Sequence, residues 1–168
     1  LKQSKAFFYL NFFLFFSFTI LFLRVALNIL IDLPLHFDEA QYWDWSQNLD
    51  WGYFSKPPLL AFLIRVVTEL CGNGENCIRS LSPFLHFLTS LIIFYSVYSL
   101  NHSFKKALLG SLLYSLMPGI SFSSFLISTD VPLLLFSSLI ALCIIKIFNS
   151  RKNTFLLFYL LGLFFALG

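Results

Sequence analysis

Long apolar runs separated by polar segments divide this chain into candidate membrane helices. A helix needs about 20 mostly apolar residues to cross the hydrocarbon core of a bilayer. The apolar runs that approach or exceed this length lie at about 6–31, 78–100, 107–121, 131–148 and 154–168. The third run loses its pattern near Pro118, and Arg24 lies near the outer end of the first run, where its side chain can snorkel to the interface. The pattern predicts an all-α fold, a polytopic bundle of transmembrane helices.

A long loop, 32–77, separates the first two runs and is polar and aromatic instead of apolar. Asp38–Leu49 has the composition of a short helix that lies at the membrane surface. At helical spacing, one face of this segment carries Asp38, Tyr42, Trp45 and Leu49. Pro58 can then begin a second, amphipathic helix over Leu59–Leu70, because proline is favoured in the first turn of a helix. We therefore expect short surface helices in this loop.

Composition agrees with a membrane protein. Of the 168 residues, 58% are hydrophobic and only 11% are charged, whereas a soluble domain is about 25% charged. So few charges cannot cover the surface of a soluble domain of this size. An ordinary soluble protein, a disordered tail and a nucleic-acid-binding module are therefore excluded. The lipid bilayer is the expected partner, and the net charge of +3 is too small to imply a polyanionic one.

The few charges are sorted between the two sides of the predicted bundle. One side has seven basic residues and no acid: Lys2, Lys5, Lys105, Lys106, Lys146, Arg151 and Lys152. The opposite side holds the other four basic residues and all eight acids. The side rich in lysine and arginine is cytoplasmic by the positive-inside rule. The N-terminus is therefore predicted to be cytoplasmic, and the loop 32–77 extracytoplasmic.

The first loop concentrates the residues with catalytic potential. Glu39 lies about 100° around a helix from Asp38, so we expect only one of these carboxylates to face a substrate. Both acids would also suit the first turn of a helix, because of its dipole, and the tryptophans of the loop could form an interfacial aromatic belt. Lys56 precedes Pro57, which holds it on a stiff, extended segment. A lysine here could equally be an ordinary interfacial snorkel.

Several stretches of the chain resemble a known enzyme family. They are Asp38-Glu39-Ala40-x-Tyr42-Trp43-x-Trp45-Ser46, Trp51-Gly52-Tyr53-Phe54-Ser55-Lys56-Pro57-Pro58, Cys71-Gly72-Asn73-Gly74-Glu75 followed by Arg79, and Thr129-Asp130-Val131-Pro132-Leu133. In this order they are similar to the bacterial branch of the protein O-mannosyltransferase family. These integral-membrane glycosyltransferases use polyprenyl-phosphate sugars, and they include lipid A aminoarabinose transferases. The resemblance implies that residues 1–168 are the N-terminal part of a glycosyltransferase membrane domain in the bacterial inner membrane.

The same resemblance implies a reaction and roles for particular residues. A sugar would move from polyprenyl phosphate to an extracytoplasmic acceptor: lipid A, another surface glycolipid or a protein hydroxyl. Asp38 would orient or deprotonate the acceptor, Glu39 would support it, and Asp130 would steer a substrate. A cation must neutralise the charge that develops on the phosphate, with Lys56 as the first choice and Arg79 as the second. The candidates for contacts with the sugar or the lipid are Tyr42, Trp45 and Tyr53.

Other interpretations of these residues stay open. A transporter or flippase-like protein would place ionisable residues near the membrane midplane, whereas the acids here lie at one face, which favours a surface reaction. Thr129 or Asp130 could simply cap the helix over 131–148. His36 and the two adjacent carboxylates could form a divalent-metal site, but this signal is weak, and no metal ligand or cofactor is assigned.

Two of the three cysteines, Cys71 and Cys77, flank a turn-rich segment of the first loop. A disulfide between them could form in an oxidising periplasm. The alternative is a pair of free thiols. Cys143 lies within the fourth apolar run and is expected to act as a small apolar residue.

Overall fold

The computed structural model describes residues 2–31, 34–150 and 154–168, and every regular element in these ranges is a helix. The elements are α1 (Lys2–Ile31), α2 (Phe37–Gln47), α3 (Leu59–Cys71), α4 (Glu75–Asn101), α5 (Phe104–Leu116), α6 (Pro118–Ser123), α7 (Asp130–Asn149) and α8 (Phe155–Leu167). Of the described helices, α1, α4 and α7 are long and apolar enough to cross a membrane. The prediction of an all-α membrane helix bundle is therefore confirmed.

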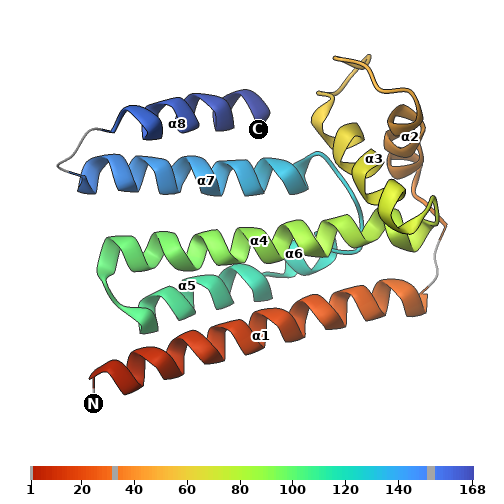
Figure 1. Ribbon diagram of the computed structural model, residues 1–168. Helices are drawn as coiled ribbons and strands as arrows, with labels where there is room; N and C mark the ends of the chain where they lie inside the picture. The colour runs from red at the N-terminus through yellow and green to blue at the C-terminus, as the bar shows by residue number, and fades with distance from the viewer. Residues whose placement is uncertain (1, 32–33, 151–153) are drawn as a thin grey trace.

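The helices lie side by side, with α4 in the middle. This helix packs against α1, α5 and α7, and α8 packs on the far side of α7 (Figure 1). One apolar cluster, near the start of α1, stacks Phe13 on Phe94 with ring centroids 4.1 Å apart. A larger cluster at the other end joins α2 and α3 to α4 and α7. Its buried members are Tyr42, Leu60, Ile64, Ile78, Leu81, Leu85, Ile127 and Val131. The first loop is thus packed onto one end of the bundle.

The run expected at 107–121 is broken into α5 and α6 at Met117–Pro118. A broken helix leaves backbone carbonyls without partners, which is costly within a membrane unless neighbouring groups supply donors. Arg24 of α1 donates from Nη2 to the Ser115 carbonyl at 2.7 Å, at the end of α5. One helical turn further along α1, Asn28 donates from Nδ2 to the Ser124 carbonyl at 3.3 Å, at the end of α6. Two side chains of α1 therefore donate hydrogen bonds to backbone carbonyls at the ends of the two short helices.

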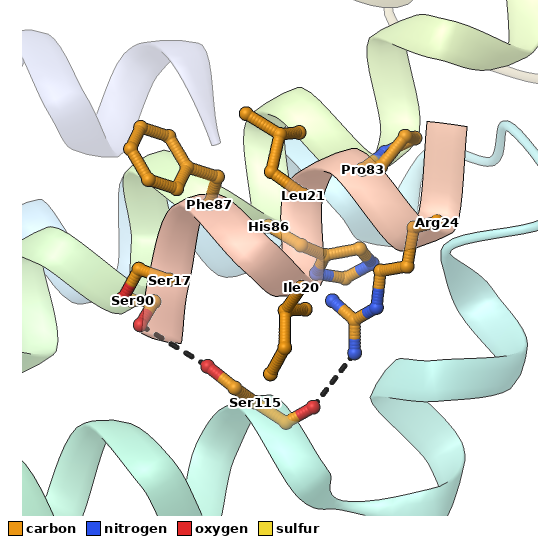
Figure 2. A pocket seen from close by; sticks show the side chains of 9 residues that line it. All are labelled: Ser17, Ile20, Leu21, Arg24, Pro83, His86, Phe87, Ser90 and Ser115. Atoms are coloured by element: carbon orange, nitrogen blue, oxygen red, sulfur yellow. Dashed lines mark hydrogen bonds between the residues drawn. The ribbon is translucent and has the colours of Figure 1, made fainter. Parts of the chain in front are cut away.

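The expectation that Arg24 snorkels to the interface is wrong. Its side chain is buried, and the guanidinium turns inward to the end of α5 (Figure 2). A cation at the C-terminal end of a helix is favourable because of the helix dipole. Beside it, Ser115 Oγ donates to Ser90 Oγ at 3.1 Å, and His86 lines the same small polar cavity of about 10 Å³. The break in the third apolar run therefore lies beside a polar layer between α1, α4 and α5.

The first loop contains the two surface helices that the pattern predicts. α2 begins and ends within two residues of the expected segment, and α3 extends only one residue beyond it. α3 is amphipathic: it buries Leu60, Ile64 and Thr68 on the side that packs against α2 and α4, while Glu69 and Leu70 are exposed. Cys71 at the end of α3 forms a disulfide with Cys77 in the first turn of α4. Of the two alternatives for these cysteines, the structure contains the bridge.

The disulfide predicts a simple labelling result. In the full-length protein, a membrane-impermeant maleimide should label Cys71 and Cys77 only after reduction, because a disulfide sulfur does not react with maleimide. The Cys71→Ser/Cys77→Ser double variant is the control, since labels that appear on reduction in the natural protein but not in this variant belong to the pair. Labelling of both thiols without reductant would contradict the bridge.

Candidate active site

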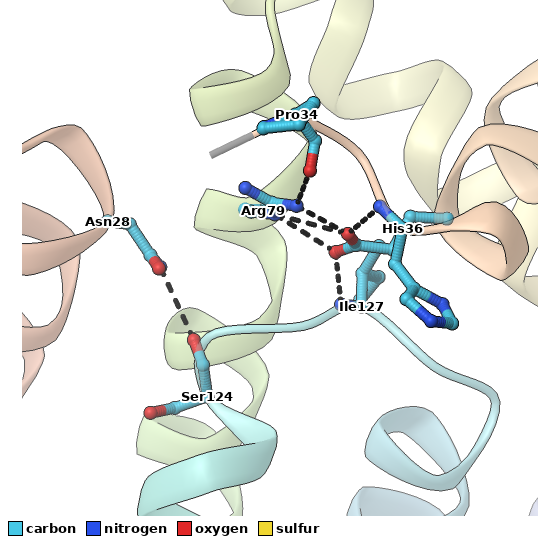
Figure 3. Close-up of polar contacts among 7 residues, drawn as sticks. Asn28, Pro34, His36, Arg79, Ser124 and Ile127 are labelled. Atoms are coloured by element: carbon cyan, nitrogen blue, oxygen red, sulfur yellow. Dashed lines mark hydrogen bonds and ion pairs between the residues drawn. The ribbon is translucent and has the colours of Figure 1, made fainter. Parts of the chain in front are cut away.

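A buried ion pair lies at the centre of the first loop. Glu39 of α2 is 1% exposed and Arg79 of α4 is 4% exposed. Arg79 Nη2 lies 2.7 Å from Glu39 Oε2, and Arg79 Nε donates to both carboxylate oxygens at 3.1 and 3.2 Å. Arg79 Nη2 also donates to the Pro34 carbonyl at 2.7 Å, at the entry to α2 (Figure 3). The opposite charges of Arg79 and Glu39 are both buried away from water, and at this short distance they neutralise each other.

The carboxylate of Glu39 also accepts two backbone hydrogen bonds. The His36 amide donates to Oε2 at 2.9 Å, which is one half of a capping box at the start of α2. The Ile127 amide, 88 positions along the chain, donates to Oε1 at 2.9 Å. Figure 3 shows His36 and Ile127 approaching this point from different segments. Glu39 thus fixes α2 both to α4 and to the segment that leads into α7.

This connection brings Asp38 and Asp130 to the same tyrosine. Tyr42 lies one turn after Asp38 on α2 and is 4% exposed. The Thr129 side chain and the carboxylates of Asp38 and Asp130 all lie close enough to the Tyr42 hydroxyl to shift its pKa. Asp38 and Asp130 are themselves exposed. The two predicted catalytic aspartates, from segments far apart in the chain, therefore act on the same hydroxyl.

The pKa of the Tyr42 hydroxyl lies above its usual value. Burial is the largest cause, the two carboxylates raise the pKa further, and the nearby Thr129 side chain lowers it. Tyr42 therefore stays protonated at neutral pH and has a hydrogen to donate. Thr129 is the residue before α7, but its side chain makes no capping hydrogen bond to that helix. The capping interpretation therefore does not apply to Thr129.

Two other predicted site residues contact each other. The rings of Trp45 and Tyr53 stack with centroids 4.6 Å apart and an interplanar angle of 5°. The Tyr53 hydroxyl donates to the Trp45 carbonyl at 2.9 Å and accepts from the Asp50 amide at 3.1 Å. These contacts fold the segment after α2 back onto that helix. One face of each ring is covered by the other.

Lys56 lies in the segment between α2 and α3, which loops away from the bundle (Figure 1). Its side chain is exposed. Within the described part of the chain, the hydrogen bonds and ion pairs include none made by Lys56. The structure therefore leaves this ammonium group available to a ligand, whereas it pairs the guanidinium of Arg79 with Glu39. Over the same ranges, no group of three or more His, Cys, Asp or Glu side chains is arranged to hold a metal ion.

Comparison with known proteins gives the family. The model for dolichyl-phosphate-mannose-protein mannosyltransferase matches residues 55–168, more than half of the chain. The chain belongs to this mannosyltransferase family. The resemblance found in the sequence is confirmed. The matched region contains Lys56, Arg79 and Asp130, while α2 with Asp38 and Glu39 precedes it.

The chain is also similar to a curated protein from a rhizobial bacterium. The lipid A galacturonosyltransferase RgtD of Rhizobium johnstonii is 39% identical over 103 residues, which cover 61% of this chain and 21% of the relative. The chain thus aligns with about a fifth of that relative's length. No solved structure matches the chain.

Sequence reasoning missed three features of this site. It treated Glu39 and Arg79 as separate candidates, although they form one ion pair. It gave no role to the Ile127 amide, because almost every residue has a backbone N–H, so the residue type does not show which amide donates to the site. It left Thr129 or Asp130 open as a cap of the helix over 131–148, whereas the Thr129 side chain makes no capping hydrogen bond.

Proposed function

We propose that this chain is part of a membrane glycosyltransferase that moves a sugar from polyprenyl phosphate to an extracytoplasmic acceptor. The observation that carries the proposal is the hydrogen bond from the Ile127 amide to Glu39, which fixes α2 with Asp38 to the segment that leads into α7 with Asp130. Both aspartates are exposed, so a substrate can reach them. Membership of the mannosyltransferase family supports the class of reaction. The name of the rhizobial relative favours lipid A as the acceptor, with another surface glycolipid or a protein hydroxyl as alternatives.

The reaction exchanges one bond at the anomeric carbon for another. The acceptor oxygen forms a bond to this carbon, and the bond to the phosphate oxygen breaks with its electron pair going to the phosphate. The acceptor proton passes to Asp38, which acts as the general base. The phosphate leaves as an anion and needs no acid to protonate it, in contrast to the leaving group in glycoside hydrolysis. Asp130 orients one substrate, and Tyr42 stays protonated beside these carboxylates.

A cation is required where the phosphate develops charge. We assign this role to Lys56, because its ammonium group is exposed and unpaired among the described residues. Arg79 was the second candidate, but its guanidinium faces Glu39. We therefore propose that Arg79 and Glu39 act as positioning residues, which set α2 so that Asp38 faces the substrate. Trp45 and Tyr53 would present the edge of their stacked pair to the sugar or the lipid chain.

We also propose the orientation of the protein in a bacterial inner membrane. The basic residues that the structure describes at one end of the bundle are Lys5, Lys105, Lys106 and Lys146, while Lys2, Arg151 and Lys152 lie outside the described side chains. α2 and α3 lie at the opposite end (Figure 1). The positive-inside rule then makes the N-terminus cytoplasmic and the proposed reaction site periplasmic.

Deleting the gene and analysing the products tests the proposed function. Mass spectrometry of lipid A, of other glycolipids and of glycoproteins should show the loss of one sugar from one of these classes. Purified full-length protein should then restore that sugar in vitro from a synthetic polyprenyl-phosphate donor. Restoration without a lipid-phosphate donor, or a deletion that changes lipid transport and no sugar linkage, would contradict the proposal.

Lys56→Ala is expected to weaken use of the donor. Loss of a charge-assisted contact with the phosphate should lower kcat/KM for the donor about tenfold or more, with little change in KM for the acceptor. Lys56→Arg should keep much of the activity because it keeps the charge. Ser55→Ala, an exposed neighbour in the same segment, is the matched control. Equal donor kinetics for Lys56→Ala and the natural protein would remove Lys56 from this role.

A further inference from the structure

The end of the bundle opposite to Asp38 and Asp130 contains two adjoining hollows. One, of about 400 Å³, lies between the start of α1 and the turn from α4 to α5, and its lining includes Lys5, Tyr9 and Lys105. The other, of about 330 Å³, lies between the ends of α4 and α7, and its lining includes Lys146. Tyr98 and His102 line both hollows. These two residues therefore form a shared wall between two basic cavities.

The positive charge of these hollows has no acidic counterpart among the described residues. The ion pairs of the described residues are Arg65–Glu69 and Arg79–Glu39, and both lie at the end of the bundle opposite to the hollows. Lys146 donates from Nζ to the Tyr95 hydroxyl at 2.8 Å and lies 4.4 Å from the centre of that ring. The aromatic ring orients the ammonium group without neutralising it. An anionic ligand would match this charge.

A buried hydroxyl in the second hollow also lacks a partner among the described residues. Ser99 Oγ is buried and makes no hydrogen bond with any of them, although Ser99 lines the hollow. Its backbone carbonyl is occupied, since Asn149 donates to it from Nδ2 at 3.2 Å. A buried polar atom without a partner reduces stability unless a ligand or water supplies the hydrogen bond. Ser99 therefore marks the place where a hydrogen-bond acceptor would fit.

The turn beside Ser99 has an unusual backbone. His102 ends α4 with a φ of 49°, in the left-handed region that non-glycine residues seldom adopt. This conformation turns the chain from α4 into α5 and sets the His102 ring edge-on to Tyr98, with centroids 6.2 Å apart. Strained backbone is concentrated at binding and catalytic sites. Here it holds a histidine in the wall between the two basic hollows.

We propose that these hollows bind the phosphate headgroup of an anionic phospholipid. The lysines and His102 would contact the phosphate oxygens, and Ser99 would donate a hydrogen bond to one of them. A lipid is favoured over a free phosphate ion because Tyr9, Phe104 and Ala6 line the first hollow beside its lysines, and such a mixed lining suits an amphiphile at the membrane interface. Basic pockets between membrane helices bind such headgroups. The site is separate from the proposed reaction site and does not depend on it.

Native mass spectrometry of the purified full-length protein tests this proposal. The protein is mixed in detergent with dioleoyl-phosphatidylglycerol or dioleoyl-phosphatidylcholine, and the lipid retained in the gas phase is counted. Phosphatidylglycerol should be retained preferentially, and each of Lys5→Gln, Lys105→Gln and Lys146→Gln should lower its retention by about fivefold or less. Equal retention of the two lipids, or no effect of the three substitutions combined, would overturn the proposal.

Ser99→Ala and Ser96→Ala provide a matched pair. Within the described part of the chain both serines have buried hydroxyls without hydrogen bonds, but only Ser99 lines the hollow. Ser99→Ala should reduce phosphatidylglycerol retention, and Ser96→Ala should leave it unchanged, with the melting temperatures of both variants measured to confirm folding. The same retention for both variants would exclude the predicted contact. Displacement of the lipid by millimolar inorganic phosphate would show that the site recognises a free phosphate ion instead, which also overturns the proposal.

Discussion

Asp38→Asn in the full-length protein is expected to abolish sugar transfer while the protein stays inserted and folded. Asparagine keeps the size of the side chain but cannot accept the acceptor proton, and positioned general bases contribute about 100-fold to 10,000-fold to rate. Because Asp38 is exposed, the substitution leaves no cavity and no unpaired buried charge. Turnover of a synthetic donor and acceptor by purified protein measures the loss, and thermal unfolding in detergent measures folding.

Asp44→Asn is the matched control for this experiment. Asp44 is also an exposed aspartate on α2, but it is not among the residues that act on the Tyr42 hydroxyl. It should retain the activity of the natural protein. Normal transfer by Asp38→Asn would remove Asp38 from the role of base. If Asp130→Asn abolished transfer in that case, the two aspartates would exchange the proposed roles of base and orienting group.

Local features of the first loop were predictable from sequence. Pro58 and the apolar spacing after it predicted α3 to within a residue at its end, because helix starts and amphipathic faces are encoded by neighbouring positions. The face of α2 that carries Asp38 and Tyr42 was predicted for the same reason. The break near Pro118 was visible as a loss of pattern, since proline removes a backbone donor and clashes with the preceding turn.

Contacts between distant segments were not predictable in this way. The Glu39–Arg79 pair joins residues 40 positions apart, and each residue alone also fitted a role at the substrate. Arg24 fitted a snorkelling position by its place in the first apolar run, yet it turns inward because the broken third run exposes the Ser115 carbonyl. In both cases the partner is created by packing of the bundle, so a pattern read along one segment contains no information about it.

Arg79→Gln is expected to cause a large loss of stability, with a loss of transfer that follows from it. The substitution leaves the Glu39 carboxylate buried without its cation, and breaking a buried ion pair costs about 3–5 kcal/mol. Glu39→Gln should have a similar effect, because it removes the carboxylate that neutralises the buried guanidinium. Chemical or thermal unfolding in detergent measures the stability, and protease sensitivity of the first loop measures whether α2 stays docked. Glu69→Gln is the matched control, since the Arg65–Glu69 pair is exposed on α3 and should contribute less than about 1 kcal/mol.

The Glu39→Gln/Arg79→Gln double variant separates a positioning role from a catalytic one. Two neutral amides remove both buried charges at once, so the double variant should be destabilised by less than the sum of the single variants. It should also regain part of the transfer that Arg79→Gln loses, because Asp38 and Asp130 are intact and α2 can dock again. If Glu39 instead took part in the chemistry, the double variant would recover stability without recovering transfer. The two readouts together therefore decide whether this ion pair acts on the substrate or only on the helix that carries Asp38.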